Sequence, residues 1–187
     1  VLWGQVNKIK IILEESLKLG ILDSFVTKED KMGRNILHNA AEIGFDDVVI
    51  SCLLDFLKTH TVKMEEMLSK RDTTGNTPLN MAIKCGRVNK IKIILEESVK
   101  LGILDSFVTN ENESGQNVLH HAAGNDCDDD VFTCLLDFVK NDTVKMEKML
   151  SKTDTDGNTP LQVAVQRRKV NKIKIILEES LKLGILD

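Results

Sequence analysis

The chain has 187 residues, of which 42% are hydrophobic and 29% are charged, and its formal net charge is −4. This balance suits one globular or repeat domain and excludes the strongly basic field that nucleic-acid-binding domains carry. Only 4% of the residues are aromatic, which argues against stacking platforms for bases, and no apolar run reaches the length of a transmembrane helix. We therefore expect no nucleic-acid partner and no membrane insertion.

One eleven-residue segment, Val-Asn-Lys-Ile-Lys-Ile-Ile-Leu-Glu-Glu-Ser, occurs three times in the chain. Its copies span Val6–Ser16, Val88–Ser98 and Val170–Ser180, at intervals of 82 residues. The apolar positions have helical spacing, so each copy is predicted to be a helix whose polar side carries the lysines and glutamates, among them Lys90 and Glu97. A segment that returns at a fixed interval is typical of a unit that buries its apolar face by stacking on copies of itself.

Each 82-residue interval contains two smaller units that begin at a glycine turn. The turns lie at Gly33, Gly75, Gly115 and Gly157, so that the steps are 40–42 residues long. Units of the first form, at Gly75 and Gly157, read Gly-Asn-Thr-Pro-Leu. Units of the second form, at Gly33 and Gly115, continue with Asn, then Leu-His-x-Ala-Ala. The two forms alternate along the chain.

The first form predicts a turn, a short helix, a second turn and a longer helix. Asp72 stands before the glycine turn, where its side chain accepts backbone hydrogen bonds. Thr77 is placed as the N-cap of a short helix with Pro78 at the first helical position. The second form predicts a longer helix over 46–58 and a short third helix over 61–70, with a counterpart over 143–152.

The pattern Gly-x-Thr-Pro-Leu-x-x-Ala, followed by a glycine and an aliphatic helix, resembles the ankyrin repeat. The strongest copy matches at Asp72, Gly75, Thr77, Pro78, Leu79, Ala82, Gly86, Ile91 and Leu95. The resemblance covers essentially the whole chain and implies an all-α repeat solenoid of stacked helix-turn-helix units.

The repeat departs from the usual ankyrin period of about 33 residues. The extra residues follow the second helix, so we expect a lengthened second helix or an added short one, with irregular or lengthened loops between repeats. HEAT repeats have a similar length, but they do not explain Gly-Asn-Thr-Pro-Leu.

We predict that the chain is a single ankyrin-like domain and a fragment of a longer protein, because Val1 is not Met and both ends fall inside repeats. Its predicted parts are a partial repeat 1–32, repeats 33–74, 75–114 and 115–156, and a partial repeat 157–187.

Clusters that suggest chemistry have structural explanations. His120 copies His38, a position that resembles a structural hydrogen-bonding histidine in ankyrin repeats, and no zinc-type spacing joins His121 to the cysteines. The acidic run at Asp126–Asp130 lacks the glycine and closing glutamate of a calcium loop, and is better explained as an acidic helix N-terminus. We therefore predict no metal, no cofactor and no enzyme activity. The four cysteines are predicted to be reduced thiols.

Residues 24–105 and 106–187 are two copies of the 82-residue repeat. Most of their positions are identical, and the positions that differ are grouped in a few segments. The differences fall in the loops, the first helices and the turns after them, and the resemblance implies that these parts line the concave, partner-binding face. Drift at exposed positions is the alternative explanation. The predicted partner-binding residues are Lys31, Arg34, Asn39, Glu42, Phe45, Asn80, Lys84, Arg87, Gln116, His121 and Arg167.

The main functional hypothesis is a cytoplasmic protein–protein interaction scaffold. An alternative is an accessory targeting array of a larger enzyme, toxin or bacterial effector, which would act in the host cytoplasm. A third interpretation is end-to-end self-association through apolar helix faces at the two ends, represented by Ile9 and Leu13 and by Ile173 and Leu177.

Overall fold

The computed structural model describes residues 2–42, 47–60, 63–126 and 128–185, and within these ranges every regular element is an α-helix. The helices in chain order are α1 (Leu2–Lys18), α2 (Leu22–Val26), α3 (Ile36–Glu42), α4 (Asp47–His60), α5 (Met64–Ser69), α6 (Pro78–Lys84), α7 (Val88–Lys100), α8 (Leu104–Thr109), α9 (Val118–Gly124), α10 (Asp129–Val139), α11 (Thr143–Ser151), α12 (Pro160–Gln166) and α13 (Val170–Leu183). The predicted all-α solenoid is confirmed.

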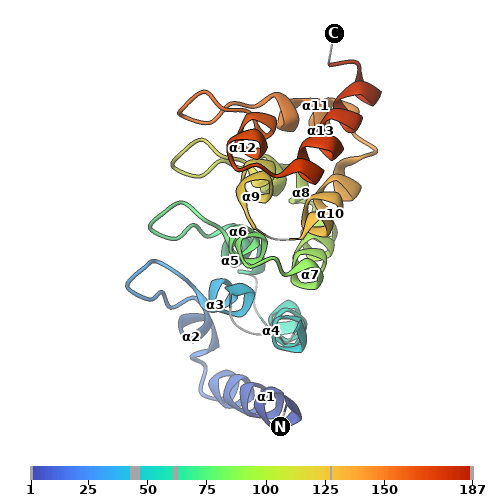
Figure 1. The fold of residues 1–187 in the computed structure, drawn as a ribbon. Helices are drawn as coiled ribbons and strands as arrows, with labels where there is room; N and C mark the ends of the chain where they lie inside the picture. Colours follow the sequence, from blue (N-terminus) through green and yellow to red (C-terminus); the bar gives the residue numbers. More distant parts are fainter. Residues whose placement is uncertain (1, 43–46, 61–62, 127, 186–187) are drawn as a thin grey trace.

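The helices form two columns that run the length of the stack (Figure 1). The first helices α3, α6, α9 and α12 contact one another in order, and the second helices α1, α4, α7, α10 and α13 do the same. Four loops project from the side of the first helices, and the two ends of the chain lie at opposite ends of the stack. This arrangement gives the molecule a loop side and a second-helix side.

The loops owe their shape to an acidic or amide side chain that precedes each glycine. Oδ1 of Asp72 accepts hydrogen bonds from the backbone N–H groups of Thr74 and Asn76, both at 2.9 Å. Gly75 then adopts a φ of +78°, which a residue with a side chain reaches only with strain. Adjacent loops are joined by backbone hydrogen bonds, such as that from Thr73 N–H to the Met32 carbonyl at 2.8 Å.

The caps of the first helices follow the sequence prediction. Thr77 is the N-cap of α6: its hydroxyl accepts from the Asn80 N–H, and the Asn80 side chain accepts from the Thr77 N–H. This capping box, with Pro78 in the first turn, satisfies N–H groups that a helix leaves without intrahelical partners. Leu79 and Ala82 on the same face are completely buried, and the small alanine lets the neighbouring helix approach closely.

The residues beyond the usual ankyrin period form added short helices, α2, α5, α8 and α11, after the second helices. Their apolar side chains are buried: Met67 and Leu68 in α5 are 1% and 0% exposed, and Phe107 in α8 is 2% exposed. The extra length therefore adds core to each unit, and of the two alternatives expected from the sequence, the added helix is the one observed.

The apolar residues at the open ends differ from the predicted ones. Leu13 is only 1% exposed, whereas Ile11 and Ile12 on the same helix are 58% and 51% exposed. At the other end, Leu181 is the most exposed of the large apolar residues of α13, at 64%. A helix in a stack has neighbours on several sides, so helical spacing alone does not show which apolar face remains open.

Candidate partner-binding surface

The loop side carries the residues that the sequence analysis assigned to partner binding, and the structure divides them into exposed, paired and buried groups. Lys31, Lys84 and Arg167 are exposed, and Asn39, Arg87 and Gln116 are half-buried. Phe45 lies outside the described residues.

Arg34 is held in a local ion-pair network. Its Nε lies 3.1 Å from the Asp30 carboxylate and its Nη1 lies 2.8 Å from the Glu42 carboxylate. Asp30 also accepts hydrogen bonds from the backbone N–H groups of Arg34 and Met32, and these bonds lower the pKa of its carboxyl group. Arg34 and Glu42 therefore fix the base of the first loop, and a partner that used them would compete with this pairing.

Asn80 does not belong to the exposed surface. It is 6% exposed, and its side-chain oxygen is committed to the N-cap of α6, where it lies 2.6 Å from the Thr77 hydroxyl. The difference between Asn80 and its counterpart Gln162 preserves this capping role, because the Gln162 side chain accepts from the Thr159 N–H at 2.7 Å. The variation that suggested partner contact is thus conservative at this position.

His121 is also buried, with 9% of its surface exposed, and its Nε2 lies 3.3 Å from Nδ2 of Asn112 at the base of the third loop. Burial, followed by the positive charge of Lys84, lowers the pKa of His121 to about 4. The imidazole is therefore neutral at physiological pH, and it contacts Asn112 at the base of the third loop.

The motif histidines connect successive units, as the resemblance implied. Nε2 of His38 lies 3.1 Å from the Asn76 carbonyl of the next loop, and Nε2 of His120 lies 3.0 Å from the Asn158 carbonyl. Burial lowers the pKa of both imidazoles, which favours their neutral form, and the Asn76 and Asn158 carbonyls place the proton on Nε2. These side chains maintain the spacing of the loops.

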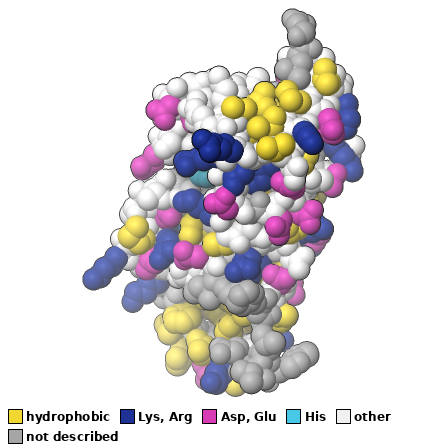
Figure 2. Space-filling model, in the orientation of Figure 1, with side chains coloured by type: hydrophobic (Ala, Val, Ile, Leu, Met, Phe, Trp, Pro, Cys, Tyr) yellow, Lys and Arg dark blue, Asp and Glu magenta, His cyan; other side chains and the backbone are white. Residues whose placement is uncertain are grey.

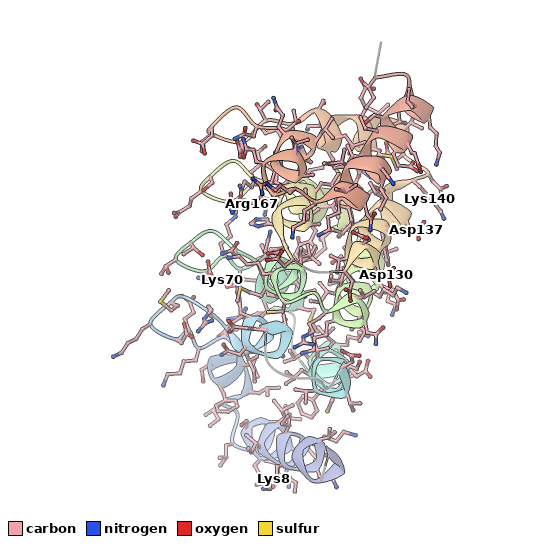
Figure 3. The ribbon with its side chains drawn as sticks, viewed as in Figure 1. Lys8, Lys70, Asp130, Asp137, Lys140 and Arg167 are labelled. Carbon is pink, nitrogen blue, oxygen red and sulfur yellow. The ribbon has the colours of Figure 1, made fainter. Side chains whose placement is uncertain are left out.

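Three exposed basic residues lie in the turns between first and second helices. They are Lys84 at the end of α6 and, two units further on, Arg167 and Arg168 after α12. In Figure 2, Lys and Arg side chains gather in the upper half of the molecule beside a histidine, and Figure 3 places Arg167 at the end of α12.

Arg168 was not among the predicted contact residues, and its backbone is unusual. It adopts a φ of +57°, where the corresponding residue of the preceding first-form unit is Gly86 with a φ of +66°. A left-handed conformation costs a residue with a side chain about 1–2 kcal/mol. A comparison of the two turns could have identified this position, since an arginine replaces a glycine that ends a helix.

A hollow of about 340 Å³ lies beside Lys84. It is lined by Lys84, Cys85, Gly86, Asn125 and Asp126. Asp126 at its rim forms an ion pair with Lys169, and this ammonium lowers the pKa of the Asp126 carboxyl group. The lining of the hollow thus contains one ammonium group, that of Lys84, and one carboxylate, that of Asp126, which is already paired with Lys169.

A larger groove, of about 550 Å³, lies on the second-helix side between α1 and α4, where Val6, Leu17, Val48, Cys52 and Phe56 supply its apolar lining. Over the part of the chain that is described, no three side chains of the His, Cys, Asp or Glu type are grouped so that they could hold a metal ion. No helix among the described residues has the length and apolar character needed to cross a membrane. Cys52, Cys85 and Cys134 are free thiols.

Comparisons with known proteins agree with this architecture. The family description "Ankyrin repeats (3 copies)" matches residues 2–105 and again residues 97–187. Among curated proteins, the chain is similar to Synphilin-1 of Mus musculus, with 25% identity over 173 residues. The aligned part is 92% of this chain but 16% of the mouse protein, so the chain spans about a sixth of the length of that relative.

Proposed function

The chain belongs to the ankyrin-repeat family, and from this premise we propose that it is a protein–protein interaction scaffold that binds its partner on the loop side, the concave face of an ankyrin stack. Repeats of this family are in general protein-interaction modules that act without chemistry of their own. The observation that carries the proposal is the exposure of the basic residues Lys84, Arg167 and Arg168, which lie in turns after the first helices that differ between otherwise similar units.

The contact surface that we propose is smaller than the one expected from the sequence. Lys31, Lys84, Arg167 and Arg168 supply the exposed charges, while Asn39, Arg87 and Gln116 are half-buried beside them. Asn80 and His121 are buried and are not proposed as contacts. The strained conformation of Arg168 supports its inclusion, because glycine would adopt the same φ at a lower cost.

The test is a quantitative affinity capture with two charge-matched variants. In the first, Lys31, Lys84, Arg167 and Arg168 are changed to glutamate. In the control, four exposed lysines of the second helices, Lys10, Lys92, Lys174 and Lys182, are changed in the same way. Mass spectrometry should show a partner that the parent and the control retain and the first variant loses. Equal retention by the first variant would refute the surface.

We also propose that the array serves as the accessory part of a larger protein, because the chain aligns with only 16% of the mouse protein. The other parts of such a protein would carry any activity, and an effector origin belongs to this proposal. Free thiols at Cys52 and Cys134 are compatible with a reducing compartment and support a cytoplasmic location. Sequencing the full open reading frame, with fractionation of the full-length protein, tests both statements.

A further inference from the structure

The four loops that precede the first helices stand side by side on the loop side of the stack (Figure 1). They cover residues 27–35, 70–77, 110–117 and 152–159. The first and third loops occupy corresponding positions in the two copies of the 82-residue repeat, and so do the second and fourth loops. A comparison of corresponding loops therefore separates the charges that every unit carries from those that belong to one end of the stack.

Contacts between neighbouring loops hold them at a fixed spacing. Nζ of Lys70 in the second loop lies 2.5 Å from the Glu29 carboxylate of the first loop. Nζ of Lys152 in the fourth loop lies 2.8 Å from the Glu111 carboxylate of the third loop. The second and third loops are joined by Arg71, whose guanidinium donates to the Glu111 carbonyl. The four loops therefore present one surface whose charges keep their positions relative to one another.

Part of the loop charge is balanced within the loops. The two lysine–glutamate pairs are the same contact in the two copies of the repeat, so they add no difference between the ends of the stack. In the first loop, Arg34 pairs with Asp30 at 3.1 Å. In the third loop these two positions hold Gln116 and Asn112, and Nδ2 of Asn112 donates to Oε1 of Gln116 at 3.4 Å. An ion pair is thus exchanged for a neutral hydrogen bond, with no change in net charge.

Every remaining charge difference between corresponding loops has the same sign, because the first two loops are always the more positive. The corresponding residues are Lys28 and Asn110, Lys31 and Glu113, Arg71 and Thr153, and Thr74 and Asp156. The two lysines and the two acidic residues of this set are exposed, and none of them forms an ion pair with another described residue. At the left edge of Figure 2, which is the loop side, Lys and Arg side chains protrude at the lower end, and Asp and Glu side chains lie at the upper end.

These charges form two poles on one face. The basic pole comprises Lys28, Lys31 and Arg71, and the acidic pole comprises Glu113 and Asp156. Packed helices lie about 8–10 Å apart, so two steps of the stack separate the poles by about 20 Å. An extended polypeptide spans this distance with about six residues. A partner complementary to this face therefore carries acidic and basic groups about six residues apart.

A flexible segment fits this face better than a second folded copy of the chain. Within the loops, all of which the structure describes, Met32 is the one exposed large apolar residue. Two copies would therefore meet through charged loop tips without an apolar core, and exposed ion pairs contribute little to a rigid interface. A segment can instead follow the line of the loops, so that each of its charged ends reaches the pole of opposite sign.

We propose that the loop side binds an elongated polypeptide segment with acidic residues at one end and basic residues at the other. The acidic end lies on Lys28, Lys31 and Arg71, and the basic end lies on Glu113 and Asp156. Electrostatic complementarity governs orientation and the rate of association more than affinity, so the poles fix the direction in which the segment lies. This inference rests on the proposed function for the side of the stack that the partner occupies, and it adds the order of charges on the partner.

The test uses a synthetic peptide of three glutamates, three Gly-Ser pairs and three lysines, with a spin label at its glutamate end. Its flexible middle places the charged ends about 15–18 Å apart on average, close to the spacing of the poles. Bound to the isotope-labelled 187-residue chain, the label should broaden the amide signals of the first loop and leave those of the fourth loop sharp. A peptide of the same composition, with glutamates and lysines alternating at each end, should bind about threefold or more weakly, because neither end matches one pole.

Two variants exchange residues between corresponding loops, so each new side chain is one that the fold already holds at the equivalent position. K28N/K31E gives the first loop the residues of the third loop. E113K/D156T gives the third and fourth loops the residues of the first and second loops. Each variant should weaken peptide binding about fivefold or more. The combined variant keeps the net charge of the parent and should bind more tightly than either, with the label now broadening the third loop instead of the first.

The matched control is K92N/K174E, which makes the same change in net charge as K28N/K31E on exposed lysines of the second helices. Peptide binding should be unchanged there, because charges at that distance are screened at physiological ionic strength. Three results would overturn the proposal: equal affinity of the two peptides, equal broadening of the first and fourth loops, or a combined variant that keeps the orientation of the parent.

Light scattering of the chain alone should show a monomer. Two copies turned end for end would bring opposite poles together. A dimer that K28N/K31E and E113K/D156T each abolish, and that their mixture restores, would therefore identify a second copy as the occupant and contradict the proposal.

The proposed function can fail separately from this inference. If the captured partner is retained after charge reversal at Lys31, Lys84, Arg167 and Arg168, the proposed contact surface is refuted, whatever the peptide does. If the peptide binds without a preferred orientation, the charge order is refuted and that contact surface is left in place.

Discussion

Replacement of His121 by asparagine should reduce the loss of stability at acidic pH. The pKa of this imidazole is lowered to about 4 in the folded chain, from an ordinary value of 6.5. Above pH 6.5 the side chain is neutral in both states and the full stability is present. As the pH falls below 6.5 the unfolded chain binds a proton that the folded chain does not, so stability is lost until the pH reaches about 4.

The size of the effect follows from the two pKa values. Because the pKa of His121 falls from 6.5 in the unfolded chain to about 4 in the folded chain, the free energy of unfolding decreases by about 2 kcal/mol between pH 7.5 and pH 5. Each pKa unit corresponds to about 1.4 kcal/mol. Asn39 occupies the same position in the other second-form unit, so H121N places a residue that the fold already accommodates. His38 and His120 remain in both proteins, and their titration cancels in the comparison.

The assay is urea unfolding of the parent and H121N at pH 7.5 and pH 5, followed by circular dichroism. The parent should lose about 2 kcal/mol more than the variant between the two pH values. Equal losses would show that His121 titrates normally in the folded chain, and would refute the argument from its burial beside Lys84. A larger loss in the variant would reverse the sign of the argument.

Five further substitutions, at four positions, test the loops and turns by urea denaturation. G75A should cost about 2–4 kcal/mol and G157A about 1–2, because both glycines have positive φ but only the first places a Cβ 2.8 Å from the backbone of the next loop; equal costs would contradict the close approach. R168G should stabilise the chain by about 1 kcal/mol, and a loss would show that the arginine side chain offsets its strain. D72A should cost about 1–3 kcal/mol, whereas D72N should be nearly neutral, because Asn112 accepts the same two backbone bonds in another loop. Equal effects of D72A and D72N would exclude the turn hydrogen bonds as the cause.

Local chemistry made much of the fold predictable from the sequence. The turn at Asp72, the cap at Thr77 and the connecting histidines depend on contacts within a few residues or on one step of the stack, and their residue types point to a single arrangement. Burial of Lys90 and Glu97 was not predicted: both were assigned to the polar side of the helix, and they are 0% and 4% exposed. An amphipathic pattern identifies one apolar face, and cannot show that the polar side meets another unit.

The candidate site was predicted less well than the fold, for a related reason. Differences between copies were interpreted as contact positions, yet Asn80 and His121 vary while buried. At Asn80 the alternative residue makes the same cap, and at His121 the larger ring finds a partner in Asn112. A difference between two units shows only that both residues are accepted at that position. Burial then shows whether the position is at the surface, where a partner could contact it, or inside the stack.

The alternation of the two forms explains why the chain repeats in steps of 82 residues instead of 40–42. A second-form helix end is completed by a lysine of the unit that follows it, Lys90 or Lys172, whereas a first-form helix end is completed by its own turn, at Gly86 or Arg168. Duplication of the pair keeps each lysine opposite an acceptor.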